Sequence, residues 1–324
     1  MMENLQPFKI YFAGSWSLSK HWLEEQGGNP VRNRLVSFAY PEQFGQWLHQ
    51  TDDAPGNVIL DSGAFSAWNK GREIDINEYI EYAHQCIAQG EKANKKVHVV
   101  NLDVIPGEAG EMKGINLIRP KTRRKIDEAA KQGFDNMVRM KKEGITPIHV
   151  FHQHEHFRWL DKMLEQTDYI GISPANDLST KARRLWMDKV FTYLNKTGAN
   201  VKTHGFGVTS IPDLKQFPWH SCDSASWVLL AAYGQVMWPV KGFKRGSVLS
   251  NSDYNVITVS EKSTKRGVGG ISEGVIKCFE RQGYSYQDLQ AENYRKLINI
   301  RTFLKMQKDL NVCKTASFKK QHFF

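Results

Sequence analysis

Residues 97–103 read VHVVNLD, a short run of β-branched residues that ends in a carboxylate. Such runs are typical of buried strands in parallel sheets. Similar runs recur along the chain, separated by longer segments with helical spacing. The predicted strands span residues 8–13, 34–39, 58–60, 97–102, 147–151, 169–172, 201–205 and 220–224, and the clearest helical segments span 76–89, 121–142, 157–165 and 181–195.

Eight strands, each followed by a helical segment, fit an α/β fold of the (β/α)8 TIM-barrel type. A doubly wound open sheet is the alternative, but no G-x-G-x-x-G follows the first strand, so a dinucleotide-binding fold has little support. We therefore expect a catalytic barrel over residues 1–237. Residues 238–324 form a basic C-terminal extension of loops and helix, for which we expect contact with nucleic acid.

Composition restricts the class of protein. The 324 residues are 40% apolar and 24% charged, which is ordinary for a globular enzyme and excludes disordered or fibrous chains. The four cysteines lie far apart, so neither a disulfide framework nor a zinc knuckle is readable, and a reducing cytoplasm fits best. No apolar stretch approaches the roughly 18 residues of a membrane span. We expect a cytoplasmic protein without a membrane partner.

The net charge of +10 is concentrated near the end of the chain. Residues 238–324 contain 16 lysines and arginines against 7 aspartates and glutamates, whereas residues 1–237 contain 28 against 27. A basic segment that follows a nearly neutral one favours a polyanionic partner such as nucleic acid. The simpler explanation of this positive charge is that it keeps the protein soluble. The sequences KGFKRGS (241–247) and KSTKRGVGG (262–270) are either flexible surface or contacts to a nucleic-acid backbone, the latter through Lys241, Lys244, Arg245, Lys265 and Arg266.

Polar side chains follow the predicted strands at their carboxyl ends, where barrel enzymes carry their active sites. They are Asp61, Asp103, His152, Ser173, Asn176, Asp177, His204 and Asp223. Any one alone is more often a helix cap or a satisfied core group. Two carboxylates on opposite sides of one pocket, such as Asp61 and Asp223, can catalyse exchange at a glycosidic bond with retention of configuration at the anomeric carbon. Asp103 can accept two N–H groups of a guanine-like base, and Phe65 can stack on that base.

Five short motifs contain or adjoin these residues: DSGAF (61–65), NLDVIP (101–106), GISP (171–174), HGFGV (204–208) and CDSASWVLLA (222–231). In this order they resemble segments of the tRNA-guanine transglycosylases, particularly the archaeosine type. The resemblance implies that Asp223 is the nucleophile and Asp61 the general acid/base, with no metal or redox cofactor. It implies base binding by Asp103, Phe65, Gly171, Ile172, Ser173, His204 and Gly205, and His152, Ser62 and Asn176 are further candidates for the pocket.

The sequence departs from the tRNA-modifying members of that family. They carry a C-x-C-x-x-C zinc site after the nucleophile, whereas only Cys278 and Cys313 follow Asp223 here. The chain is most similar to the compact enzymes of bacteriophages and bacterial DNA-modification systems that exchange guanine in DNA for a 7-deazaguanine. DNA is therefore favoured over tRNA. The expected incoming base is a 7-deazaguanine such as 7-cyano-7-deazaguanine, the location is the host cytoplasm if the chain is phage-encoded, and a homodimer is a further expectation.

Two other functions remain open at this point. The stretch HVFHQHEH (149–156) has alternating histidines, which could bind a divalent ion in a metal-dependent TIM-barrel hydrolase together with His204 and Asp223. A non-enzymatic DNA-binding protein explains the basic extension but leaves three aspartates at strand ends unexplained.

Overall fold

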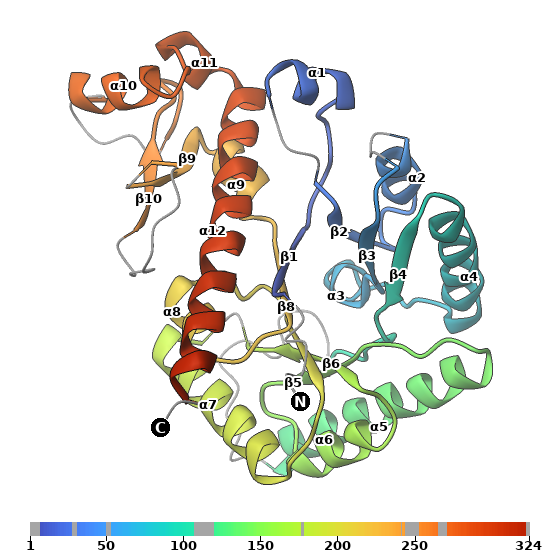
Figure 1. The fold of residues 1–324 in the computed structure, drawn as a ribbon. Coiled ribbons are helices and arrows are strands. Elements are labelled where there is room, and N and C mark those ends of the chain that lie inside the picture. The colour runs from blue at the N-terminus through green and yellow to red at the C-terminus, as the bar shows by residue number, and fades with distance from the viewer. Residues whose placement is uncertain are drawn as a thin grey trace.

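A computed structural model describes residues 7–27, 31–49, 53–106, 120–175, 178–240, 242–243, 253–264 and 271–321. Its centre is a sheet of parallel strands that alternate with helices (Figure 1). All eight predicted strands are confirmed, with shifts of at most a few residues at their ends. They are β1 (Lys9–Phe12), β2 (Asn33–Ser37), β3 (Gly56–Asp61), β4 (Lys95–Val99), β5 (His149–His152), β6 (Tyr169–Ser173), β7 (Lys202–Gly205) and β8 (Ser221–Ser224).

The sheet curls until its two edge strands meet. The strand order is β4-β3-β2-β1-β8-β7-β6-β5, and a parallel bridge between Val100 and Ile148 joins β4 to β5. The Ile148 N–H donates to the Val99 carbonyl and the Asn101 N–H donates to the Ile148 carbonyl, each at 2.8 Å. The predicted (β/α)8 TIM barrel is therefore confirmed, and the open doubly wound sheet is wrong.

Helices surround the strands. They are α1 (Lys20–Glu25), α2 (Glu42–Leu48), α3 (Ala64–Asn69), α4 (Ile76–Lys92), α5 (Pro120–Lys142), α6 (Phe157–Leu164), α7 (Thr180–Lys196), α8 (Ile211–Gln216) and α9 (Ser226–Ala232). The four predicted helical segments correspond to α4, α5, α6 and α7. Across the described ranges, every helix is too short or too polar to cross a bilayer.

The chain after β8 differs from the prediction in two respects. A hairpin of β9 (Gln235–Pro239) and β10 (Tyr254–Thr258) precedes α10 (Glu273–Glu280), and its antiparallel strands were not predicted because no tight-turn signal joins them. The helix expected within the C-terminal extension is, after α10, two helices, α11 (Tyr286–Gln290) and α12 (Glu292–Gln321). Ala291 separates them because its backbone is extended.

The long helix α12 covers the barrel beside β1 (Figure 1). Strands β1 and β2 are in register at only one pair, Phe12 and Arg34, so part of the β1 backbone has no strand partner on that side. Asn311 of α12 accepts a hydrogen bond from the Phe8 N–H at 2.7 Å and donates to the Phe8 carbonyl at 3.0 Å. Gln307 accepts from the Ile10 N–H at 2.6 Å. Side chains of α12 thus replace a neighbouring strand.

This arrangement predicts a stability cost for Asn311→Ala. The substitution leaves the N–H and the carbonyl of Phe8 without their side-chain partner, and an unsatisfied buried polar group costs about 1–3 kcal/mol. We expect urea denaturation to show a loss of this size. Lys308→Ala, on the exposed side of the same helix, is the control and should change stability by less than about 0.5 kcal/mol. Equal effects of the two variants would contradict the role of Asn311.

Candidate active site

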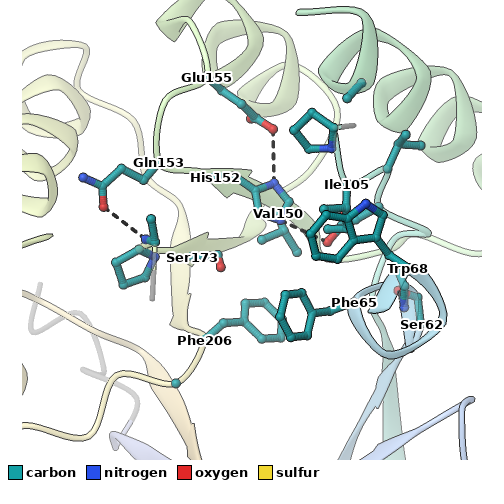
Figure 2. A pocket seen from close by; sticks show the side chains of 18 of the residues that line it. Ser62, Phe65, Trp68, Ile105, Val150, His152, Gln153, Glu155, Ser173 and Phe206 are labelled. Carbon is teal, nitrogen blue, oxygen red and sulfur yellow. Dashed lines mark hydrogen bonds and ion pairs between the residues drawn. The ribbon is translucent and has the colours of Figure 1, made fainter. Parts of the chain in front are cut away.

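A pocket of about 780 Å³ opens at the carboxyl ends of the strands (Figure 2). Such an opening is where barrel enzymes bind substrates. The fold brings seven of the sequence-predicted residues to its lining: Asp61, Ser62, Phe65, Asp103, His152, Ser173 and Asp223. The three aspartates come from the ends of β3 and β8 and from the loop after β4. Residues distant in the sequence therefore form one site.

The other predicted residues are not part of this lining. His204 is fully buried behind Asp223, and Gly171, Ile172 and Gly205 belong to the packed barrel wall. Packing explains why residue 171 is a glycine, because a Cβ at this position would lie 2.4 Å from the Phe206 ring. Asn176 and Asp177, and the predicted backbone contacts Lys241, Lys244, Arg245, Lys265 and Arg266, lie outside the described residues.

The carboxylate of Asp223 is held by the turn that follows the neighbouring strand β7. Its Oδ1 accepts a hydrogen bond from the Gly207 N–H at 2.8 Å and lies 3.4 Å from Nε2 of His204. Nδ1 of His204 is 2.7 Å from the Ser221 hydroxyl, which is 2.6 Å from the Tyr169 hydroxyl. When Tyr169 donates to Ser221 and Ser221 donates to His204, the proton of the His204 ring is on Nε2, on the side of Asp223. Nε2 has no hydrogen-bond partner among the described residues, so His204 packs behind Asp223 and does not line the pocket.

Asp61 is a buried carboxyl group with two donors. Its Oδ2 accepts from the Ser37 hydroxyl at 3.1 Å and from the Gly63 N–H at 3.0 Å. Burial raises the pKa of Asp61 to about 6, and the nearby charges of Asp103 and Asp223 add to the rise. Gly63 has φ +74°, and a Cβ there would lie 2.8 Å from the backbone of Ala39. Glycine is required at this position for the donor to reach Asp61.

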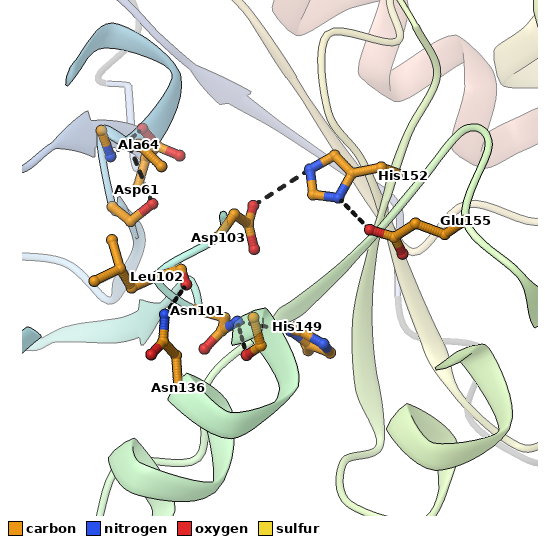
Figure 3. Close-up of polar contacts among 12 residues, drawn as sticks. Asp61, Ala64, Asn101, Leu102, Asp103, Asn136, His149, His152 and Glu155 are labelled. Carbon is orange, nitrogen blue, oxygen red and sulfur yellow. Dashed lines mark hydrogen bonds and ion pairs between the residues drawn. The ribbon is translucent and has the colours of Figure 1, made fainter. Parts of the chain in front are cut away.

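Asp103, His152 and Glu155 form a chain of charged groups (Figure 3). Nε2 of His152 lies 3.5 Å from Oδ2 of Asp103, and Nδ1 lies 3.1 Å from Oε1 of Glu155. Burial alone would lower the pKa of His152, but the two carboxylates outweigh it and raise the pKa to about 10. The role of Glu155 was not predicted. The only signal for it in the sequence was its place three residues after His152.

Aromatic rings form two walls of the pocket. Phe65 is 58% exposed at the mouth, and its ring lies 5.9 Å from that of Trp68. Phe65 and Phe206 point toward each other from different elements (Figure 2). Phe206 was not singled out from the sequence. The pair can flank a flat heterocycle, because aromatic faces stack on bases with little sequence preference.

The histidines of residues 149–156 do not converge. His149 lies on the outer face of β5, where its Nδ1 is 2.8 Å from Nδ2 of Asn101 and burial lowers its pKa to about 4. His152 and His154 line the pocket, and His156 caps α6. Over the described ranges, no three His, Cys, Asp or Glu side chains are grouped so that they could hold a metal ion.

The raised pKa of Asp61 predicts that Asp61→Asn stabilises the protein above pH 6. A carboxyl whose pKa rises on folding destabilises the native state as it ionises, and each pKa unit corresponds to about 1.4 kcal/mol. The amide keeps an acceptor for Ser37 and Gly63 but carries no charge. We expect a gain of up to about 3 kcal/mol in the free energy of unfolding at pH 8, and a smaller gain at pH 5. Equal stability of the variant and the wild type at pH 8 would contradict this account.

Comparison with known proteins assigns no family. No protein-family model and no curated protein matches the sequence. The functional conclusion therefore depends on the five motifs and on the geometry of the pocket.

Proposed function

We propose that the protein is a base-exchange transglycosylase, which replaces guanine in DNA with a 7-deazaguanine through a covalent glycosyl-aspartate intermediate. The observation that carries the proposal is that Asp61, Asp103 and Asp223 line one pocket at the carboxyl ends of the barrel strands. The resemblance to tRNA-guanine transglycosylases rests on these same aspartates. Each has different partners, as separate roles require.

Asp223 is the proposed nucleophile. Its carboxylate forms a bond to C1′ of the target nucleotide while the bond from C1′ to N9 of guanine breaks. The Gly207 N–H holds Oδ1 and His204 packs beside it, which leaves the other carboxylate oxygen for the attack. A second displacement, by N9 of the incoming base, then releases Asp223 and gives net retention at C1′.

Asp61 is the proposed proton carrier. A carboxyl with a pKa of about 6 gives up and takes back a proton near neutral pH. It donates a proton to the departing guanine and removes the N9 proton of the incoming base. Ser37 and Gly63 keep its position fixed through both steps.

Asp103 and the aromatic walls are the proposed recognition elements. The Asp103 carboxylate accepts hydrogen bonds from N1–H and the exocyclic amine of the base, a pattern that guanine and 7-deazaguanines share. Phe65 and Phe206 stack on the two faces of the ring. Ser62 and Ser173 add hydroxyl groups to the lining.

DNA is the proposed polymer because the sequence after Asp223 lacks the cysteine pattern of the tRNA-specific zinc site. In duplex DNA the target base must leave the stack, at a cost of a few kcal/mol. The basic residues of the C-terminal part would offset some of that cost through phosphate contacts.

Labelled guanine tests the proposal without knowledge of the incoming base. We expect the wild type to incorporate label into DNA, and Asp223→Ala and Asp223→Asn to reduce incorporation by at least about 10³-fold, because the covalent step is lost. Asp168→Asn is the matched control, since Asp168 pairs with Lys202 just before β6, at the opposite end of the barrel. It should retain wild-type exchange.

Duplex DNA, single-stranded DNA and unmodified tRNA are assayed in parallel, and nucleic-acid binding is measured by fluorescence anisotropy. Incorporation of label into tRNA alone would mean that the substrate is tRNA and that the proposed mechanism acts on it. Substantial exchange by Asp223→Ala would show that Asp223 is not the nucleophile. Binding without label in any polymer would favour a non-enzymatic nucleic-acid-binding protein.

A further inference from the structure

We propose that His152 is a positioning residue for base recognition, held between Asp103 and Glu155 so that the side chain of Asp103 is presented in a fixed orientation to the N–H donors of the base. This inference rests on the proposed function and concerns the same pocket. It assigns roles to His152 and Glu155 that no motif indicated.

The turn after β5 is built to bring Glu155 back onto His152. The Glu155 N–H donates to the His152 carbonyl at 3.2 Å, and His154 between them has φ +93°, a strained value for a residue with a side chain. Gln153 ties the turn to the next loop, since its N–H donates to the Ser173 carbonyl and its Oε1 accepts from the Ala175 N–H, both at 3.1 Å. The strained turn is thus fixed at both sides.

Glu155 acts through His152 rather than on the base. Its side chain is only 10% exposed, and its Oε2 is buried without a hydrogen-bond partner. A buried carboxylate oxygen without a hydrogen bond is unfavourable, so the Glu155 carboxylate needs a compensating interaction. His152 supplies that interaction at Oε1.

The opposite side of His152 faces Asp103. The contact from Nε2 of His152 to Oδ2 of Asp103 sets the rotation of the Asp103 carboxylate. The remaining lone pairs of that carboxylate are then directed toward the pocket. Only the imidazolium form of His152 donates at both ring nitrogens, so the contacts to Asp103 and Glu155 are made together when the ring is protonated. A neutral ring donates at one nitrogen only, and the hold on Asp103 or on Glu155 is then lost.

The groups that face this chain come from several elements. Asp103 follows β4, Glu155 follows β5, and His149 lies at the start of β5 on its outer face. Asp61 and Asp223 face Asp103 and each other across the pocket. No lysine or arginine is present among the described lining residues, so the histidines at 152 and 154 are its basic side chains.

The test measures binding of labelled guanine by equilibrium dialysis at pH 7 to 9.5, together with the ring titration of His152 by NMR at pH 6 to 11, in the full-length protein. The variants are Glu155→Gln, His152→Gln and His152→Ala. Glu165→Gln, on the exposed end of α6, is the control. Thermal unfolding verifies that each variant is folded.

In Glu155→Gln we expect the His152 titration midpoint to fall by about one pKa unit or more, because one flanking carboxylate is lost. Its guanine Kd, taken relative to that of the wild type and of Glu165→Gln at the same pH, should then weaken roughly threefold to tenfold between pH 7 and pH 9.5. His152→Ala should weaken binding about tenfold at every pH. His152→Gln, which keeps a donor toward Asp103, should recover part of that loss.

An unchanged His152 midpoint in Glu155→Gln, or a guanine Kd that does not depend on pH in that variant, would overturn the inference. Guanine binding with these pH effects but without exchange into any polymer would support the inference and overturn the proposed function. Failure of the wild type to bind guanine would overturn both.

Discussion

Two hydrogen bonds of Ile148, one to the Val99 carbonyl and one from the Asn101 N–H, close the sheet, and the pocket exists because of that closure. In a closed parallel barrel every strand ends at the same rim, so Asp61, Asp103, His152 and Asp223 meet although more than 160 residues separate the first from the last. An open sheet would place β3 and β5 far from one another. The charged groups of the site depend on this single topological constraint.

Closure of the barrel also brings several carboxylates together, and groups next to each carboxylate offset the resulting repulsion. Three aspartates and Glu155 share a pocket whose walls are largely apolar, and carboxylates so placed disfavour each other's ionisation. Each is given different partners: a hydroxyl and a backbone N–H for Asp61, a backbone N–H and a buried histidine for Asp223, and an imidazolium for Asp103. Chemically identical side chains thereby acquire different hydrogen-bond partners and orientations, and the pKa of Asp61 rises to about 6.

The sequence predicted the barrel well because strand formation is encoded locally, in β-branched runs that end in polar residues. It also indicated which carboxylates share the rim, since parallel strands place their carboxyl ends together. It could not show that His204 lies behind Asp223 or that Phe206 turns into the pocket, because both depend on packing between strands. The contact of Glu155 with His152 was equally hidden, since it follows from a strained turn that no composition rule predicts.

The contact between Asn311 and Phe8 links residues 303 positions apart, which constrains the order in which the barrel can be completed. During synthesis the first strand emerges long before the helix that satisfies its backbone. Strand β1 can pair with β8 once residues 221–224 have been made, but its contact with α12 must wait until nearly the whole chain is present. An exposed strand edge is a site of unwanted association during that interval. Because the first strand depends on the last helix, the two ends of this chain are joined only late in synthesis.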